Sequence, residues 1–231
     1  MSPSRSRAPV IHGEGASIAW RLVMAGIEIE RMSPAELDAA CEVIGLAFAD
    51  NPNTLAVVRG DEAKARRMTQ VAVRAAKLGR AISHVLVAKE GGRVVGVLNA
   101  AEWPRCQLGA GEKLRIVPAM IRVAGLALAR SMKLMRVWAE HDPRKPHWHL
   151  GPIGVHPRFQ GRGIGKALLK AFLRTVDERA SAAYLETDVD RNVALYEKFG
   201  FAVVARAEIM GIDNRFMWRE PAPLDDGLEA G

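Results

Sequence analysis

A strand-like apolar run that enters a loop with three alternating glycines constrains the fold of this chain more than any other feature. The run covers residues 150–155, the glycines are Gly161, Gly163 and Gly165, and an amphipathic helical pattern follows at once. Because glycine carries no side chain, the backbone N–H groups of such a loop can turn inward together. At the N-terminus of a helix they form a site for an anion, most often a phosphate. The segment therefore predicts a strand–loop–helix unit that binds a phosphate-bearing ligand.

The hydrophobic periodicity of the chain predicts one mixed α/β domain over residues 26–220, between a flexible extension (1–25) and a C-terminal tail (221–231). Strand, loop, helix and strand over 150–187 form a crossover unit. Pro118 is predicted to bound a helix or to stand in its first turn. The expected strands are 27–32, 84–89, 94–99, 148–155, 183–187, 201–208 and 215–218, and the expected helices are 33–49, 62–78, 112–139, 163–179 and 192–199.

Composition excludes several classes of protein. Of the 231 residues 49% are hydrophobic, enough for a sizeable core, yet no run of about 18 apolar residues exists to predict a membrane span. Cys41 and Cys106 are too few for a disulfide framework or a cysteine-based metal cluster, so we expect a cytoplasmic protein. The net charge of +7 is spread along helices without a nucleic-acid reader motif, so no nucleic-acid partner is predicted.

Two familiar phosphate-binding loops do not fit the glycine segment. A Walker loop needs glycine where this chain has Gln160, and a magnesium-binding hydroxyl where it has Ala167. A dinucleotide fingerprint needs one more residue before its third glycine than the spacing of Gly161, Gly163 and Gly165 provides. The ligand is therefore neither a Walker-type nucleotide nor a dinucleotide.

A third type of loop does fit, and a second motif agrees with it. Residues 160–165 (Gln-Gly-Arg-Gly-Ile-Gly) match Q/R-x-x-G-x-G/A, and residues 192–201 (Asn-Val-Ala-Leu-Tyr-Glu-Lys-Phe-Gly-Phe) match N-x-x-x-Y-E-K/R-x-G-F. In this order the two motifs resemble the GNAT-type N-acetyltransferase superfamily, and 147–201 looks similar to puromycin-type members. The resemblance implies an α/β fold with a central twisted, mostly antiparallel sheet whose fourth and fifth strands splay apart between flanking helices.

The resemblance also implies acetyl-CoA as co-substrate, bound where those two strands splay. Pro152 and Gly154 suit an interrupted strand, because proline cannot donate to a ladder and glycine often marks a bulge or a close backbone approach. The backbone of Ile153 and Val155 would then pair with the pantetheine amides, and 160–166 would hold the pyrophosphate. The residues expected to bind the cofactor are Ile153, Val155, Gln160, Gly161, Arg162, Gly163, Gly165, Lys166 and Asn192.

Some of these residues have ordinary structural interpretations as well. Arg162 and Lys166 either add charge near the phosphates or are solvated residues at a helix start. Asn192 either hydrogen-bonds the cofactor arm or caps the N-terminus of the helix that it begins.

By the same resemblance the reaction is direct transfer of acetyl from the thioester to an amine in a ternary complex. Tyr196 occupies the position of the acid that protonates the departing thiolate, or it packs its helix against the core. Glu186 is the first candidate for the base and His149 the second. Residues 140–142 precede the strand of His149, where they could face the acceptor. His147 and His149 could share one strand face and suit a metal, but no third ligand is evident in the sequence, so it predicts no metal.

The acceptor is expected to be a small-molecule primary amine. A protein N-terminus or lysine as acceptor, and a non-catalytic acyl-CoA sensor, stay open as alternatives. No membrane partner is predicted, and a homodimer is possible, since many members of the superfamily dimerise.

Overall fold

A computed structural model describes residues 22–24 and 26–222 of the chain. The predicted extension at 1–25 and tail at 221–231 therefore lie almost wholly outside the described residues. Within them, the strands form a single mixed sheet in the order β1-β2-β3-β4-β5-β6-β8-β7. The strands are β1 (Leu22–Met24), β2 (Ile27–Arg31), β3 (His84–Glu90), β4 (Arg93–Glu102), β5 (Trp148–Val155), β6 (Ala183–Thr187), β7 (Ala202–Ile209) and β8 (Ile212–Arg219).

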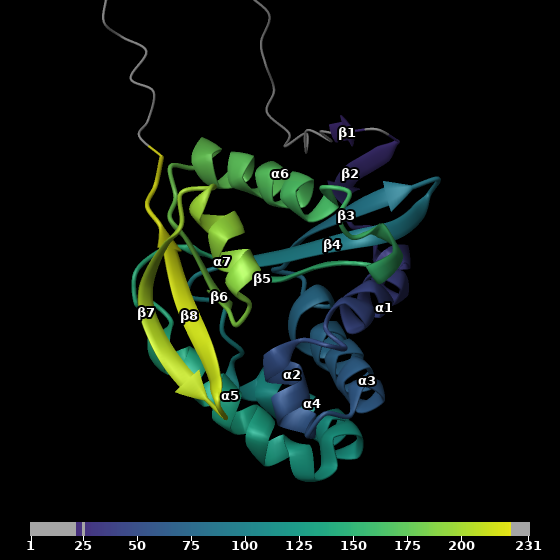
Figure 1. Ribbon diagram of the computed structural model, residues 1–231, viewed down its shortest axis with the longest axis vertical. Helices are drawn as coiled ribbons and strands as arrows, with labels where there is room; N and C mark the ends of the chain where they lie inside the picture. The colour runs from purple at the N-terminus through teal and green to yellow at the C-terminus, as the bar shows by residue number, and fades with distance from the viewer. Residues whose placement is uncertain (1–21, 25, 223–231) are drawn as a thin grey trace, which may run out of the picture.

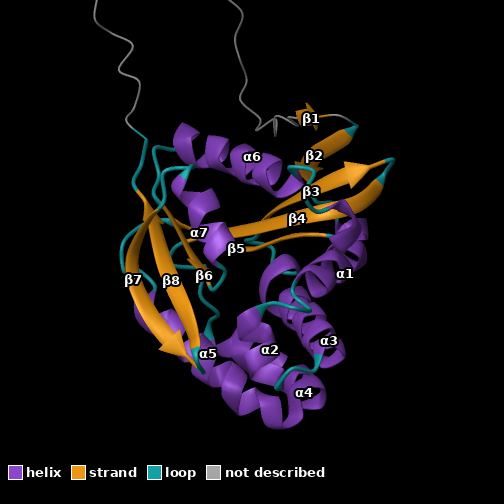
Figure 2. Ribbon diagram, viewed as in Figure 1, coloured by secondary structure: helices purple, strands orange, loops and turns teal. Residues whose placement is uncertain are grey.

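Helices cover both faces of the sheet (Figures 1 and 2). α6 packs on one face against β2 to β5, while α1 packs on β4 and β5 from the other side and is itself covered by α3. No helix in the described part of the chain has the length and hydropathy to cross a membrane. The helices are η1 (Pro34–Glu36), α1 (Leu37–Ala47), α2 (Pro52–Val58), α3 (Glu62–Val73), η2 (Arg74–Leu78), α4 (Ala110–Ala124), η3 (Gly125–Ala127), α5 (Leu128–His141), η4 (Pro157–Phe159), α6 (Ile164–Glu178) and α7 (Asp190–Glu197).

The predicted mixed α/β fold is confirmed, and local sequence chemistry explains where helices start. Before α1, Glu36 Oε2 accepts hydrogen bonds from the backbone N–H and the hydroxyl of Ser33, at 2.7 and 2.9 Å. The side chain of Asp61 accepts from the backbone N–H of Lys64 at 2.8 Å and so caps α3. These contacts satisfy N–H groups that have no partner inside the helix.

The structure departs from the sequence expectations at three helices. The segment expected to break the first helix itself forms α2, because Asn51 caps it and Pro52 occupies its first position. Pro118 lies inside α4 and bounds no helix; it is exposed, so the carbonyl that it leaves without a donor can bind water. The expectation that Asn192 begins a helix is also wrong, since α7 starts at Asp190 with Val189 as its N-cap.

A break in the ladder of β5 is the feature of the fold that matters most for the site. Leu98 of β4 pairs with Ile153 and Ala100 pairs with Leu150, so Gly151 and Pro152 together face Asn99. This bulge fits the predicted interruption at Pro152. A Cβ on Gly154 would lie only 2.9 Å from side-chain atoms of Ala47 and Ile44 of α1, so this position of β5 has no room for a side chain.

The protonation of His84, at the start of β3, makes the stability of the fold depend on pH. Its ring packs edge-on against Trp148, with centroids 5.5 Å apart, and the Arg31 guanidinium donates to its Nδ1. Burial, followed by the positive charges of Arg31 and Arg179, lowers the pKa of His84 from its usual 6.5 to about 4. His84 is therefore neutral in the folded protein at neutral pH.

As pH falls from about 7 to about 4, His84 becomes protonated in the unfolded chain but stays neutral in the folded protein. We therefore expect His84 to lower the free energy of unfolding over this range by up to roughly 3 kcal/mol. A His84→Gln variant keeps an acceptor for Arg31 but cannot be protonated, so its stability should fall less steeply. Urea unfolding of both proteins across this range measures the difference, and parallel pH profiles would contradict the prediction.

Candidate active site

The glycine loop lies between β5 and α6 and has the conformation that its sequence predicts. Gly161 and Gly163 have φ of 76° and 79°, in the left-handed region that favours glycine, and Gly163 is the N-cap of α6. The Gln160 side-chain amide donates to the carbonyl of Val155 at 3.2 Å and holds the loop against the end of β5. The first N–H groups of α6 have no acceptor within the helix, so they can bind an anion placed at the loop.

The two basic residues of the loop differ in their surroundings. Arg162 forms an ion pair with Glu90 at the end of β3, and its guanidinium carbon lies 5.4 Å from the centre of the Phe159 ring. Lys166 is exposed in the first turn of α6. Of these two residues, Lys166 is therefore the one whose positive charge has no described carboxylate competing for it and could attract an anion at the loop.

β5 and β6 splay apart, as the resemblance to the superfamily implies. Over the described residues their parallel pairing consists of Trp148 with Ala183 and His149 with Tyr184. Beyond these pairs, 150–155 keeps only β4 as a ladder partner, and Ile153 pairs there with Leu98. The backbone edge of Ile153 and Val155 that faces away from β4 is thus available to form hydrogen bonds with an extended ligand that carries amide groups.

A buried array of charged side chains lies at the point where the strands part. His149 Nε2 is 3.0 Å from Glu186 Oε2, and His149 Nδ1 is 3.1 Å from Asp142 Oδ1 at the end of α5. The side chains of all three residues are 6–7% exposed. The structure therefore brings together both base candidates, Glu186 and His149, and adds Asp142 behind them.

The neighbouring groups of this array stabilise each other's charged forms, as the pKa shifts of His149 and Asp142 indicate. Burial alone lowers the pKa of His149, but the charge of Glu186 and hydrogen bonds with Asp142 and Cys106 raise it well above its usual value. Burial raises the pKa of Asp142, and the two nearby histidines, His147 and His149, more than offset this and lower it. Both ring nitrogens of His149 face carboxylates, Asp142 on one side and Glu186 on the other.

Three further residues extend the array. His147 lies two residues before His149, with its Nε2 3.5 Å from Asp142 Oδ1, and the Cys106 sulfur is 3.8 Å from Asp142 Oδ2. Burial lowers the pKa of Lys77, at the end of η2, and the charge of Glu186 raises it in part. The sequence expectation that no third ligand-type group accompanies the two histidines is wrong, since Cys106 and Asp142 both adjoin them.

These groups had only weak sequence signals. The alternation of His147 and His149 could be read from the sequence, and Asp142 is one of the residues before the strand that could face the acceptor. Cys106 and Lys77 lie 36 or more positions from Asp142 along the chain, and neither sits in a pattern that names a partner. Of the other two acceptor-side candidates, Glu140 pairs with Arg136 at the surface, and His141 stacks on Phe216 with centroids 4.1 Å apart.

Tyr196 lies in α7, apart from the charged array. It is buried in the main core, with its ring 5.9 Å from that of Phe201. Burial, and then the charge of Asp188, raises the pKa of Tyr196, so the hydroxyl stays protonated. Asn192, in the same helix, is half-buried and has its backbone N–H bonded to the carbonyl of Val189 at 2.9 Å.

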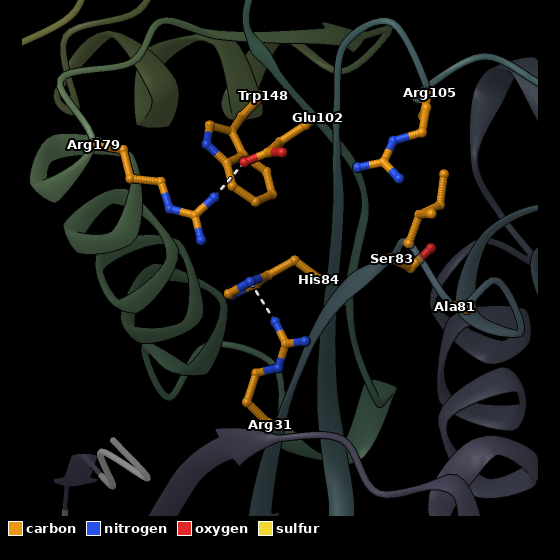
Figure 3. Close-up of a pocket in the computed structure, with 9 residues that line it drawn as sticks. Arg31, Ala81, Ser83, His84, Glu102, Arg105, Trp148 and Arg179 are labelled. Atoms are coloured by element: carbon orange, nitrogen blue, oxygen red, sulfur yellow. Dashed lines mark hydrogen bonds and ion pairs between the residues drawn. The ribbon is translucent and has the colours of Figure 1, made fainter. Parts of the chain in front are cut away.

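A polar hollow of about 200 Å³ opens at the far end of α6 and contains no residue of the glycine loop (Figure 3). Its walls include His84, Glu102, Trp148 and Arg179, and the ion pair of Arg179 with Glu102 crosses it. Because α6 has 15 residues, this hollow and the glycine loop are separated by about 20 Å of helix. The hollow is therefore a separate feature of the surface and not the phosphate site.

A comparison with protein families decides the identity of this architecture. The model described as "Acetyltransferase (GNAT) family" matches residues 59–201, which is more than half of the chain. The chain belongs to this family. The match includes the glycine loop, the splayed strands and the whole buried array, so the family resemblance drawn from two short motifs is confirmed.

Named relatives match over short segments. A mycothiol acetyltransferase of Propionibacterium freudenreichii subsp. shermanii is 39% identical over 70 residues, which are 29% of this chain and 22% of the relative. The N-alpha-acetyltransferase RimI of Mycobacterium tuberculosis is 49% identical over 51 residues, which are 21% of this chain and 31% of that protein. The chain therefore matches less than a third of either relative's length.

Solved structures of GNAT proteins share the fold over most of the chain. One from Corynebacterium glutamicum, titled "histone acetyltransferase HPA2 and related acetyltransferase", has a TM-score of 0.60 at 24% identity and covers 85% of this chain and 97% of its own. The protein yncA of Salmonella typhimurium, solved with its cofactor acetyl-CoA, has a TM-score of 0.51 at 16% identity and covers 89% and 99%. At these identities the likeness shows the fold.

Two glycines of the loop should respond differently to alanine. Gly163 has φ of 79°, where a Cβ is strained, so Gly163→Ala should lower the free energy of unfolding by about 1–2 kcal/mol. Gly165 lies inside α6, where an added Cβ meets only Val155 at 3.6 Å, so Gly165→Ala should be neutral or stabilise by up to about 1 kcal/mol. Denaturant unfolding of both variants tests this, and equal losses would show that the loop is not held in this conformation.

Proposed function

We propose that this protein is an acetyl-CoA-dependent N-acetyltransferase that moves an acetyl group directly to the primary amine of a small molecule. The observation that carries the proposal is the buried Glu186–His149–Asp142 array at the point where β5 and β6 part. It puts a carboxylate with a fixed orientation beside the gap, and the glycine loop suited to a pyrophosphate follows the other end of β5. The shared fold of a structure solved with acetyl-CoA supports the choice of co-substrate.

The arrangement of α2 favours a small acceptor. Asn53 exchanges hydrogen bonds with Asn214 of β8 at 2.7 and 3.3 Å, and Asn51 and the Asn53 backbone bond Asp188 at 2.9 and 2.8 Å. Trp138 of α5 donates to the same Asn214 oxygen at 3.0 Å. These buried contacts tie α2 across the side of the sheet that carries Glu186, next to β8 in Figure 1. An extended peptide would have to break them to lie there, whereas a small amine would not.

In this mechanism Glu186 is the base. Acetyl-CoA supplies the acetyl group as a thioester, and Glu186 accepts the proton that the amine must lose before its nitrogen lone pair forms the new C–N bond. His149 donates its Nε2 hydrogen to Glu186 and holds the carboxylate in one orientation. His149, the second base candidate, is therefore a positioning residue, and backbone N–H groups near Val155 polarise the carbonyl oxygen.

Tyr196 is the proposed acid. As the C–S bond breaks, the sulfur needs a proton, and Tyr196 stays protonated because burial and the charge of Asp188 raise its pKa. It belongs to the core on the α6 side of the sheet, while Glu186 belongs to the opposite face. Acid and base thus lie on two sides of the gap. This arrangement suits a reaction in which Glu186 takes a proton from the amine nitrogen while Tyr196 gives one to the sulfur.

An amine screen with the full chain tests the proposed acceptor. Release of the free CoA thiol from acetyl-CoA should proceed with small primary amines, at a kcat/KM at least about tenfold above that for peptides with a free N-terminus. A higher kcat/KM for peptides than for small amines would instead assign the protein to the peptide-acetylating enzymes, in line with the match to the N-alpha-acetyltransferase RimI. Tight acetyl-CoA binding without turnover on any amine would instead indicate a non-catalytic sensor.

Single-group substitutions test the acid and the base. Glu186→Gln and Tyr196→Phe should each lower kcat by about 10²–10⁴-fold, because each removes one proton-transfer group while keeping its shape. Acetyl-CoA affinity, measured by calorimetry, should stay within a few fold in both variants.

The chain offers a matched control for each variant. Glu140→Gln removes a carboxylate that pairs with Arg136 at the surface, and Tyr184→Phe removes the hydroxyl of the other tyrosine in the chain. The Tyr184 hydroxyl reaches only the carbonyl of His141, at 3.3 Å, so both controls should keep kcat within a few fold of the parent. A control that loses as much rate as its partner would contradict the assigned role.

A further inference from the structure

We propose that Cys106, Asp142, His147 and His149 form a structural zinc site beside the catalytic gap. One donor atom of each, a thiol sulfur, a carboxylate oxygen and two imidazole nitrogens, lies within 4.8 Å of all the others. They come from three parts of the chain: the loop after β4, the C-cap of α5 and the start of β5. Sulfur, nitrogen and oxygen donors in this combination suit zinc.

The spacing of the donors fits a tetrahedral ion. With Zn–N near 2.1 Å and Zn–S near 2.3 Å, the donors of a tetrahedral site lie about 3.3–3.7 Å from one another. Here Asp142 Oδ1 is 3.1 Å from His149 Nδ1 and 3.5 Å from His147 Nε2, and Asp142 Oδ2 is 3.8 Å from the Cys106 sulfur. These three pairs are within a few tenths of an ångström of the tetrahedral range. The other donor pairs lie within 4.8 Å, so an approach of at most about 1 Å would complete the site.

An unsatisfied buried nitrogen points to a missing partner. His147 is 2% exposed, and its Nε2 makes no hydrogen bond; it has only the ion-pair contact with Asp142 Oδ1 at 3.5 Å. Leaving such an atom unpaired in the protein interior costs free energy. A metal ion at the centre of the four donors would satisfy it.

The outer nitrogens of both histidines are arranged as in metal sites. His147 Nδ1 lies 2.8 Å from the carbonyl of Lys145, and His149 Nε2 lies 3.0 Å from Glu186 Oε2. Each ring can therefore donate its outer N–H to an oxygen, which leaves His147 Nε2 and His149 Nδ1 as lone-pair donors toward Cys106 and Asp142. This pairing of an outer acceptor with an inner lone pair is what orients histidine ligands in known metal proteins.

The remaining ligands are also held from outside. Gln107 donates to Asp142 Oδ2 at 2.8 Å, and Arg80 binds the carbonyl of Arg105 at 2.9 Å while it pairs with Glu112 at 2.8 Å. The loop that presents Cys106 is thus fixed on both sides. Gln107 and Arg105, on either side of Cys106 in the chain, also line a hollow of about 610 Å³.

All four donors are buried or nearly so, which indicates a closed, structural site. Zinc there would fasten the loop after β4 and the end of α5 to β5, and would fix the ring of His149, which orients Glu186. The zinc proposal rests on these contacts alone and stands whether or not the proposed acetyl transfer is correct.

Metal binding to the full chain tests the site without measuring activity. Protein stripped with a chelator and dialysed should take up one zinc per chain by elemental analysis, and a hundredfold excess over Kd should raise Tm by about 5–10 °C. Cobalt in place of zinc should give the intense visible bands of a tetrahedral ion and a thiolate-to-cobalt charge-transfer band. Uptake of no metal, or a cobalt spectrum with weak octahedral bands only, would overturn the proposal.

The two cysteines of the chain provide a matched pair of variants. Cys106→Ser should abolish the thiolate-to-cobalt band and weaken zinc binding at least tenfold, whereas Cys41→Ser, on the buried face of α1, should leave both unchanged. A charge-transfer band that survives in Cys106→Ser and disappears in Cys41→Ser would place the metal elsewhere. Should Cys106→Ser not fold, the cobalt spectrum of the parent protein still decides between a tetrahedral thiolate site and none.

Discussion

The divergence of β5 from β6 is the constraint on which the rest of this structure depends. Only Trp148 and His149 of β5 pair with β6, and the bulge at Gly151 and Pro152 interrupts the ladder on the other side. A sheet that stayed paired would have buried this backbone edge in its own hydrogen bonds. Because it parts, one edge of β5 is left for a ligand, and the glycine loop at its end presents the N-terminus of α6 to the same ligand.

The parting of the strands also determines what lies on each face. Side chains alternate along β5 and β6, so Trp148 and Leu150 join the core under α6, while His149 and Glu186 turn toward the helices on the opposite face. The acidic and imidazole groups gather on that second face because the end of α5 and the loop after β4 bring Asp142 and Cys106 to it. The fold therefore separates the proposed phosphate site, which uses backbone, from the side chains proposed to transfer protons, which are buried.

Local sequence patterns correctly predicted the elements whose conformation depends on a few consecutive residues. β6 spans the predicted residues 183–187, and the positive φ of Gly161 and Gly163 follows from the motif around them. The patterns failed where a neighbour in space decided the outcome. α2 forms because its cap and its packing outweigh the turn-like composition of 50–53, and Pro118 is tolerated inside α4 because solvent reaches that turn.

The sequence by itself determined the family, because the spacing within two short motifs is local to the chain. The pyrophosphate loop and the candidate acid and base followed from the family resemblance that these motifs carry. Only the tertiary structure decided that Glu186 and His149 act on one another, that Tyr196 lies on the other side of the gap, and that Cys106 joins Asp142 and two histidines. The physical reason is sequence separation. Contacts between residues 36 or more positions apart depend on how whole strands and helices pack, and no local period records them.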